Sequence, residues 1–561
     1  MIPKKYFTLF HSKLRGKAVE CFSIIGLAVG KEKFAPAAKE TIEVMLKLQI
    51  TPEMWLEDDD TIQYMISAWT RIAKVLGEDF SPYLPHVMPP LLQACKIKPE
   101  VSILDEDEAN NLDVEQWQVV RMPGDTSQIG IKTSGIELKT TAFSMLVCYV
   151  KEVGKCPDFQ QYLKDVIELA VSELKFYFDG DVRVYAAQII ESIVDHYKID
   201  PWHQYNLCHE LTNSIREDPD LEVKPEIMDV LAKCIEDLMD TPDQIFRNDQ
   251  EIGEIFELLG EYLSEHLDNS YARTTQRAGE EHDDGDEEEL AEGAETDEYI
   301  LQKIVDILHS IFGTQKEKAL PFYEKLHESF KRLIDPSSVF SDRQWALCVF
   351  DDIIERCGQH ALKYADFFLP HLVNGLTDDA GEIRQACAYG IGILAKSCDT
   401  HSLQGSIYDQ ALMKGYEILT NVVSTGLAQQ KNEANLSPDE CEFEVEPWEN
   451  AVSSMGKVIR FASYIKPMEG NFKQWMQFLD QAGGITSDQE EAEATYSALE
   501  THLIEFVVRL VFMRTDFSNA LVRMAQLVGH RKQPTLDRRF RMPGDLRQFN
   551  RRLARQRRPR R

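Results

Sequence analysis

The chain has 561 residues, which is too long for one hydrophobic core, so we expect either several domains or one repeat array. Its 61 basic and 94 acidic side chains give a net charge of −33, and 43 % of its residues are apolar. A body this acidic repels nucleic acid and attracts basic proteins. No stretch approaches the roughly 18 consecutive apolar residues that a membrane-spanning helix needs.

The charge is unevenly distributed along the chain. Residues 509–561 contain 16 basic and 3 acidic side chains, which is +13, so the rest of the chain carries −33 − 13 = −46. Residues 1–14 have no apolar segment typical of a secretory signal peptide. The eleven cysteines form no C-x-x-C pair, and several lie inside apolar helical patterns. This usage indicates reduced, buried thiols in a cytosolic or nuclear protein.

One pattern recurs along the chain: an apolar helix, a short polar turn, and a second amphipathic helix. In residues 179–190 an Asp-Gly-Asp turn precedes Val182, Ala186 and Ile189, which fall on one helical face. Residues 378–389 repeat this arrangement. Second helices are predicted to begin near residues 15, 62, 137, 182, 224, 299, 343, 383, 449 and 491. Six of these nine intervals are 40–47 residues, the period of HEAT or armadillo helix pairs.

The polar turns between paired helices have a structural interpretation. Asp179 or Asp181, and Asp378 or Asp379, can accept backbone N–H groups at the start of the second helix. The arginines that follow, Arg183 and Arg384, are expected to bridge to the neighbouring repeat.

The three longer intervals between second helices contain insertions. No run of alternating strands is evident in the sequence, so we predict an all-α chain. HEAT repeats are expected over residues 1–267, with an acidic insertion containing Trp117 at 96–133. A disordered acidic loop is expected at 268–298, and further repeats at 299–508 with a polar insertion at 425–447. Residues 509–561 form an Arg-rich divergent tail, expected to be disordered after 530.

The acidic loop and the tail each allow two interpretations. Between residues 280 and 298, 12 of 19 residues are acidic and none is basic, so this segment is either a solvated linker or a mobile surface that holds basic segments of a partner. The tail is either an RNA-binding or nuclear-localisation segment, or sequence unrelated to the body from an imperfect gene model. The acidic-loop residues proposed to act in binding are Glu280, Glu281, Asp283, Asp284, Asp286, Glu287, Glu288 and Glu289.

No catalytic, metal or cofactor motif is found, so we expect no enzyme activity. Residues 26–31 are one residue short of a phosphate-binding loop and lack its Ser or Thr. His203 and His209 do not have the spacing of zinc ligands. Asp351, Asp352 and Glu355 are interpreted as a surface anion patch, because general acids would need a cleft.

Several segments resemble a known family. Residues 14–34, 129–139, 306–312, 342–356 and 364–370 are similar to the karyopherin-beta (importin-beta) family, and within it to the importin-five or karyopherin-beta-three subfamily. The resemblance covers about residues 14–505 and what looks like the C-terminal half of such a receptor. The family's N-terminal domain, where it first contacts the GTPase Ran, has no counterpart in this resemblance, so we expect a fragment or truncated form.

The resemblance implies a fold and a function. The fold would be a HEAT-repeat, right-handed superhelical solenoid of the armadillo type. The function would be nuclear import, in which an acidic concave face binds nuclear localisation signals of basic cargo such as ribosomal proteins or histones. Phe-Gly nucleoporins would bind between outer helices, and Ran-GTP would release cargo from a monomer that shuttles between cytoplasm and nucleus without membrane binding. The candidate cargo-binding carboxylates are Glu191, Asp195, Glu236, Asp237, Asp351, Asp352 and Glu355.

Two alternatives remain open at this stage. The chain could be a HEAT-repeat scaffold, or a chaperone for basic proteins without Ran-regulated transport. A scaffold of another kind, such as a phosphatase regulatory or chromosome-organising subunit, predicts more regular repeats than the three long insertions allow. An enzyme would need a pocket and a motif that the sequence does not show.

Overall fold

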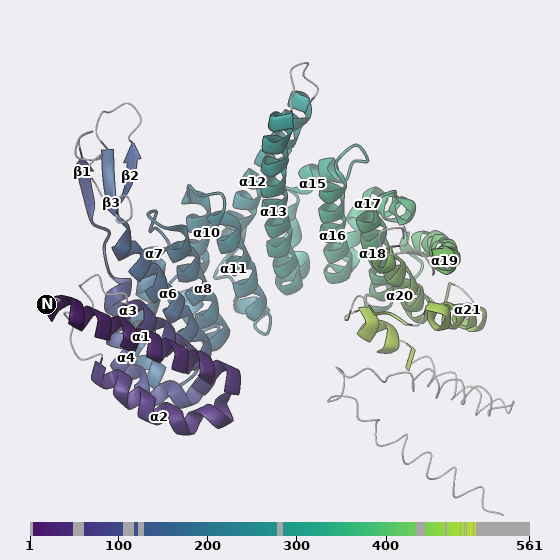
Figure 1. Ribbon diagram of the computed structural model, residues 1–561. Coiled ribbons are helices and arrows are strands. Elements are labelled where there is room, and N and C mark those ends of the chain that lie inside the picture. Colours follow the sequence, from purple (N-terminus) through teal and green to yellow (C-terminus); the bar gives the residue numbers. More distant parts are fainter. Residues whose placement is uncertain are drawn as a thin grey trace, which may run out of the picture. The chain divides into compact units, whose positions relative to one another are not determined.

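The chain is described by a computed structural model (Figure 1). It covers residues 4–48, 61–104, 117–121, 128–277, 284–433, 444–465, 468–482, 484–486, 489, 491–497 and 499–500. Two compact units are present, Met1–Gly415 and Tyr416–Arg561, and each is described separately below. The predicted tail at 509–561 lies outside the described residues.

The first unit is built almost entirely from helices. Its α-helices are α1 (Lys4–Val29), α2 (Lys31–Leu48), α3 (Thr61–Leu76), α4 (Leu84–Cys95), α6 (Thr133–Val153), α7 (Gln160–Glu173), α8 (Gly180–Tyr197), α9 (Ile199–Gln204), α10 (Leu207–Glu217), α11 (Val223–Asp237), α12 (Asp249–Arg277), α13 (Asp284–Gln315), α14 (Leu320–Tyr323), α15 (His327–Leu333), α16 (Phe340–Arg356), α17 (Leu362–Asn374) and α18 (Gly381–Thr400). Short 3-10 turns connect several of them: η2 (Gly77–Tyr83), η3 (Pro157–Phe159), η4 (Pro242–Gln244), η5 (Lys316–Ala319), η6 (Gly358–Ala361) and η7 (Gly375–Thr377).

The second helix of each pair forms a continuous layer in this unit. In chain order α1, α3, α6, α8, α11, α13, α16 and α18 each pack against the next (Figure 1). Each is also covered by a partner helix, as α7 covers α8, α10 covers α11 and α12 covers α13. The apolar stripes read from the sequence are buried between them, with Ile190, Ile227 and Leu301 fully inaccessible. The predicted HEAT-repeat solenoid is therefore confirmed as the fold class.

The insertion at 96–133 contains strands that the sequence analysis does not predict. β1 (Val101–Leu104), β2 (Trp117–Arg121) and β3 (Gln128–Lys132) form an antiparallel sheet in the order β1-β3-β2. Val101 pairs with Ile131, and Trp117 pairs with Lys132. Strands of four or five residues give little periodic signal, and their pairing depends on contacts distant in sequence.

The acidic segment at 268–298 is helical where the sequence predicts a disordered loop. Helix α12 continues to Arg277 and α13 already begins at Asp284, leaving residues 278–283 outside the described part. Arg277 binds Glu287 at 2.7 Å, Arg273 pairs with Asp297, and Leu290 is buried. These ion pairs offset the self-repulsion that composition alone suggests.

The polar turn before α8 has its predicted role. The Asp179 Oδ1 accepts the backbone N–H of Val182 at 2.9 Å and so caps the helix. Arg183 donates to both carboxylate oxygens of Asp218, from Nε at 2.7 Å and Nη2 at 3.1 Å. It also donates to the carbonyl of Phe176. Because the two charged side chains are 3 % and 0 % exposed, the predicted bridge to the next repeat is a buried, bidentate ion pair.

The corresponding turn before α18 is built differently. Asp378 accepts the Ala380 N–H at 3.1 Å, and the bridge between repeats comes from Arg343 of α16, at 2.6 and 3.2 Å from the Asp378 carboxylate. Arg384 donates to the carbonyls of Asp378 and Asp379 in its own turn. The two Arg–Asp pairs are nevertheless equivalent, because in each an arginine near the start of a second helix (α8 or α16) binds an aspartate 35 residues later, in the turn before the next second helix.

The second unit contains most of α19 (Tyr408–Glu433), α20 (Val445–Phe461) and α21 (Met468–Ala482). The polar insertion predicted at 425–447 is helical up to Glu433 and again from Val445, while 434–443 lie outside the described residues. Trp475 Nε1 donates to the Val452 carbonyl at 2.8 Å. Lys457 of α20 is buried against Glu491, which follows α21 in the chain, at 2.6 Å, so polar contacts as well as apolar ones stabilise this unit.

Among the helices that the structure describes, none has the length and apolarity to cross a membrane.

Removing the buried bridge between repeats is expected to destabilise the first unit strongly. Arg183→Ala leaves the Asp218 carboxylate buried without its partner, which costs about 3–5 kcal/mol in the free energy of unfolding. Lys175→Ala, which breaks an exposed pair with Glu217, is the matched control and costs about 0–1 kcal/mol. Urea titrations followed by circular dichroism measure both, and equal small losses would contradict a structural role for the buried pair.

Candidate functional site

Four carboxylates gather at the C-terminal ends of two neighbouring second helices. Glu191 and Asp195 lie one turn apart on α8, and Glu236 and Asp237 end α11, which packs directly on α8. The apolar stripes of both helices face the core, so these carboxylates stay partly or fully accessible. We call these four residues the α8–α11 acidic cluster.

The electrostatics of the cluster show that its members repel one another. The pKa of the Asp237 carboxyl is raised, first by burial and then by the nearby charges of Asp195, Glu191 and Glu236. Asp195 is different, because Lys155 at 3.4 Å and Lys198 at 3.7 Å lie beside it. Burial acts against the charged form there, yet the lysines hold the pKa of Asp195 below its usual value.

The cluster keeps an excess of negative charge. Lys198 also donates to the backbone carbonyl of Asp237 at 2.9 Å, so it is shared between α8 and α11. Within the described ranges no cation lies within ion-pair distance of the carboxylates of Glu191, Glu236 and Asp237. His196 also contacts Asp195, at 3.1 Å, and Lys233 of α11, which pairs with Asp229, lies close enough to Glu191 to interact with its charge. Direct cationic contacts in the described part are therefore confined to Asp195. The surplus can be neutralised by a cationic side chain from outside the cluster.

The next stretch of the layer is locally balanced. Lys303 of α13 binds Asp229 of α11 at 2.8 Å and Asp306 of its own helix at 3.2 Å. Lys233 adds a second cation to Asp229 at 2.6 Å. These cations hold the pKa of Asp229 below its usual value although burial opposes them. Asp229 and Asp306 therefore form ion pairs within and between repeats, and their negative charge is largely neutralised.

The prediction of a surface anion patch is wrong for two of its three residues, Asp351, Asp352 and Glu355. Asp351 and Asp352 are only 5 % and 8 % exposed, because α16 packs against α13 on one side and α18 on the other. Asp352 accepts a hydrogen bond from His309 of α13 at 2.7 Å. Asp351 lies so close to α18 that a Cβ added at Gly390 would be 2.4 Å from its Oδ1. Both carboxylates sit between repeats.

Glu355 is the accessible member of that group, and it is already paired. Lys396 of α18 binds it at 2.6 Å and Arg356 at 3.3 Å. Burial opposes its ionisation, but these two cations lower the pKa of the carboxyl. Of the seven predicted cargo-binding carboxylates, the structure thus brings Glu191, Asp195, Glu236 and Asp237 together and places the other three in contacts between repeats.

The residues of the predicted acidic loop also differ in their surroundings. Glu280, Glu281 and Asp283 lie outside the described residues, and the side chains of Asp284 and Asp286 are likewise not described. Glu287 pairs with Arg277, while Glu288 and Glu289 are exposed on α13. The exposed carboxylates continue along this helix at Glu292, Glu295 and Glu298, which the sequence analysis did not single out.

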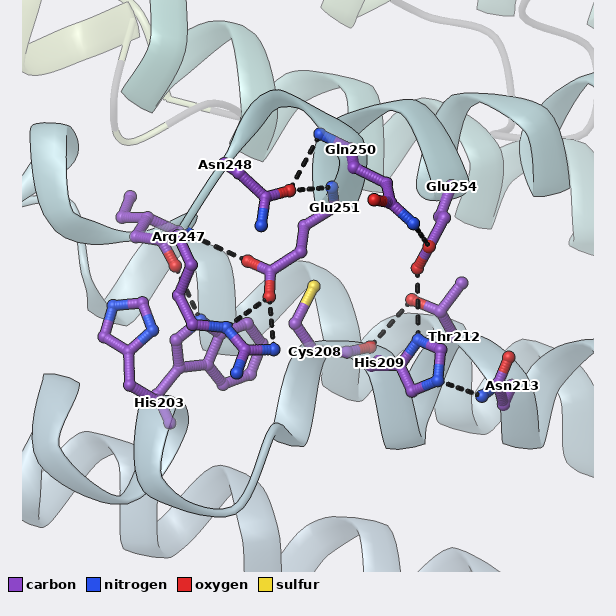
Figure 2. A network of polar contacts seen from close by, with 12 residues as sticks. His203, Cys208, His209, Thr212, Asn213, Arg247, Asn248, Gln250, Glu251 and Glu254 are labelled. Carbon is purple, nitrogen blue, oxygen red and sulfur yellow. Dashed lines mark hydrogen bonds and ion pairs between the residues drawn. The ribbon is translucent and has the colours of Figure 1, made fainter.

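His203 and His209 take part in a polar network between α9, α10 and α12 (Figure 2). His209 contacts Glu254 through Nδ1 at 3.1 Å and Asn213 through Nε2 at 2.8 Å. His203 meets the Gln244 carbonyl at 2.5 Å, and the two imidazoles belong to separate parts of the network. No group of three or more potential metal ligands occurs in the part of the chain that the structure describes.

The sequence analysis missed the cations that decide which carboxylates are free. Lys155 follows α6, and His309 lies on α13, so each comes from a neighbouring repeat. Their separation in sequence from Asp195 and Asp352 is 40 and 43 residues. Each separation is about one repeat period. Searching for a cation one period away from each carboxylate could therefore have predicted both pairs.

These features define a class of protein: a HEAT-repeat solenoid whose second-helix layer, in the described part, carries an acidic cluster in which three of four carboxylates have no direct ion pair. Comparisons with known proteins agree with this class. The family descriptions "Importin repeat 6" and "HEAT repeat" match residues 224–336 and 368–398. Importin subunit beta-3 of Saccharomyces cerevisiae is 27 % identical over 534 residues, covering 93 % of this chain and 45 % of the relative.

Other similar proteins point in the same direction. A probable importin-5 homolog of Dictyostelium discoideum is 24 % identical over 514 residues, covering 88 % of this chain and 44 % of its own. The crystal structure of Kap121p is similar with a TM-score of 0.69 and 24 % identity, over 98 % of this chain and 49 % of Kap121p. The chain therefore spans about half the length of the relatives it matches. The resemblance to the karyopherin-beta family is confirmed.

The contact between α13 and α16 predicts a displaced histidine titration. The hydrogen bond that His309 donates to Asp352 raises the pKa of His309 above its ordinary value near 6.5. The ion pair between His309 and Asp352 therefore contributes fully to the free energy of unfolding at a pH below the ordinary pKa of histidine. This contribution is lost as the pH rises through the raised pKa of His309. Asp352→Asn is expected to lower the pKa of His309, as measured by deuterium exchange at the imidazole C2 position.

His371 is the internal control for this experiment. Burial lowers its pKa, and it lies on α17 without contact to Asp352, so its titration should not change in the Asp352→Asn variant. An unchanged His309 titration in that variant would contradict the assigned pair.

Proposed function

We propose that this chain acts in nuclear import as a transport receptor of the importin-beta type, or as a portion of one. It would bind nuclear localisation signals of basic cargo and carry them through the nuclear pore. The observation that carries this proposal is the α8–α11 acidic cluster on the layer of second helices, where three of four carboxylates have no direct ion pair among the described residues. The similarity to importins over most of the chain supports it.

The cluster is suited to lysine and arginine side chains in an extended segment. Neighbouring helices in a packed layer lie about 8–10 Å apart, so carboxylates on α8 and α11 can contact successive basic residues of one peptide. Among the described residues, no cation lies within ion-pair distance of the carboxylates of Glu191, Glu236 and Asp237, so no direct ion pair there has to break before they accept a cation. A bound cation also relieves the repulsion that raises the pKa of Asp237. Affinity should therefore fall with added salt.

The relatives indicate the further partners in this proposal. Kap121p has been crystallised bound to RanGTP, to Nup53p, and to Ste12p, Pho4p and Ulp1p. By this likeness we assign to this chain Ran-GTP as the releasing factor, Phe-Gly nucleoporins as pore contacts, and ribosomal proteins or histones as cargo. It would shuttle between cytoplasm and nucleus as a monomer, without a cofactor or enzymatic activity.

Charge reversal within the cluster is expected to weaken binding of a basic peptide. The double variant Glu191→Lys and Glu236→Lys should raise the Kd for a fluorescent Lys/Arg-rich peptide by at least about tenfold, or 1.4 kcal/mol. The difference from the parent chain should shrink as salt rises, because the lost term is Coulombic. Fluorescence anisotropy at several salt concentrations measures both effects.

The control is the double variant Glu257→Lys and Glu265→Lys, which reverses two exposed carboxylates on α12, outside the layer of second helices, and so changes the net charge by the same amount. It changes the net charge without changing the cluster and should leave the Kd within about twofold, the small effect that distant charges have at physiological salt. Equal weakening by both substitutions would show attraction to net charge alone. It would contradict a site at α8 and α11.

A nuclear import assay distinguishes a transport receptor from a HEAT-repeat chaperone of basic proteins. In permeabilised cells the chain should carry a fluorescent basic cargo into nuclei, and Ran-GTP should release that cargo from it. Tight binding that Ran-GTP does not reverse, without nuclear accumulation, would favour the chaperone.

A further inference from the structure

Three large apolar side chains lie exposed in two neighbouring turns. Tyr177 and Phe178, in the turn before α8, are 48 % and 46 % exposed, and Leu221, in the turn before α11, is 49 % exposed. A single exposed apolar residue is ordinary in a soluble protein, but a group of them marks an interaction site. We call these three residues the turn patch.

Contacts between the two turns bring the turn patch together. The guanidinium carbon of Arg183 lies 5.7 Å from the centre of the Tyr177 ring, and its Nη2 donates to Asp220 at 3.4 Å. A Cβ added at Gly180 would lie 2.9 Å from Val223, the first residue of α11. The turn before α8 therefore packs directly against the turn before α11.

The core positions in these two turns are already filled by other residues. Phe176 is buried, with the Lys139 ammonium of α6 4.2 Å from the centre of its ring. The Phe178 ring lies 5.4 Å from that ring and is still half exposed, and Val223 is buried two residues after Leu221. The turn patch therefore stays in contact with water, and covering it with apolar side chains of another molecule is favourable.

Helix α13 adds an acidic surface on the far side of α11. Its Tyr299 is 40 % exposed and donates to Glu226, in the first turn of α11, at 2.9 Å. The exposed residues Glu295, Glu292 and Glu288 precede Tyr299 at intervals of four, three and four, which places them on the same side of α13. We call these three glutamates the α13 acidic face.

The α13 acidic face extends past the end of α11 at which the turn patch lies. Tyr299 meets Glu226 and, further along both helices, Lys303 meets Asp229, so α13 and α11 run in the same direction. Residues 284–298 of α13 therefore project beyond the start of α11. Among the described residues, no cation lies within ion-pair distance of the three glutamates.

We propose that the turn patch and the α13 acidic face together bind an amphipathic basic segment of a partner protein. Its apolar side chains would cover the turn patch, and its lysine or arginine side chains would meet the glutamates. A purely basic segment would leave the apolar side chains in water, and an acidic segment would be repelled by α13. A second copy of this chain fits poorly, because a symmetric pairing would bring two identical acidic faces together.

This surface lies at the other end of α8 from the α8–α11 acidic cluster. The turn patch precedes Gly180, the first residue of α8, whereas Asp195 is in the last turn of that helix. A helix of 18 residues is about 27 Å long, so both surfaces can be occupied at once. The inference goes beyond the proposed function and does not depend on it.

Two fluorescent peptides of identical leucine and lysine composition provide the probe. In the first, about 18 residues long, the leucines recur at helical spacing and form one apolar side. In the second, the same residues follow in an order without that spacing. Fluorescence anisotropy with the full chain should give a Kd for the first peptide at least about tenfold lower, because only the first presents apolar and cationic sides separately.

Two double variants that each remove two exposed apolar side chains locate the binding. Phe178→Ser with Leu221→Ser should raise the Kd of the first peptide at least about tenfold, since apolar anchors carry much of such an interface. The control is Leu14→Ser with Ile25→Ser on α1, where the two side chains are 59 % and 52 % exposed. It should leave that Kd within about twofold. Both double variants should unfold at the same temperature as the parent chain.

A charge-reversal pair tests the acidic part of the surface. Glu292→Lys with Glu295→Lys should also raise the Kd of the first peptide at least about tenfold at low salt, whereas Glu257→Lys with Glu265→Lys on α12 should leave it within about twofold. Equal affinity for the two peptides, or equal weakening by a site variant and its control, would overturn the inference. It would also be overturned if light scattering showed dimers of the chain alone that Phe178→Ser with Leu221→Ser breaks.

Discussion

The packing of each second helix against the next one is the constraint on which the rest of this structure depends. A helix covered on two sides has little room for polar groups, so each buried charge between repeats needs a partner about one repeat away. Arg183 with Asp218 and His309 with Asp352 meet this need between neighbouring helix pairs. The same packing fixes which side chains remain at the edge of the layer and can act on other molecules.

This constraint divides the negative charge of the body into two kinds. Carboxylates between α13, α16 and α18 are buried or matched by lysine, arginine and histidine, so they hold repeats together. At α8 and α11 three carboxylates lack a direct ion pair among the described residues, and burial together with the neighbouring negative charges raises the pKa of Asp237. A net charge of −33 therefore describes long-range attraction for cations, and the α8–α11 acidic cluster is the local binding site that we propose for them.

The sequence was sufficient for features that depend on local order or on the regular repeat. The cap at Asp179 involves a backbone group three residues away, and the 40–47-residue period and the bridge from Arg183 to Asp218, 35 residues on, follow from the regular succession of helix pairs. It was insufficient where contacts outside this repeat pattern decide the outcome. Pairing of Val101 with Ile131, the ion pair between Arg277 and Glu287, and the burial of Asp351 each depend on a neighbour that composition does not reveal.

The central claim is that free carboxylates at α8 and α11, and not net charge, receive a basic segment. Hydrogen–deuterium exchange of the full chain, with and without a saturating Lys/Arg-rich peptide, tests it most directly. The account predicts that protection on binding concentrates at the C-terminal turns of α8 and α11 and leaves α16 unchanged. Protection centred on α16, or spread evenly over the acidic helices, would contradict it.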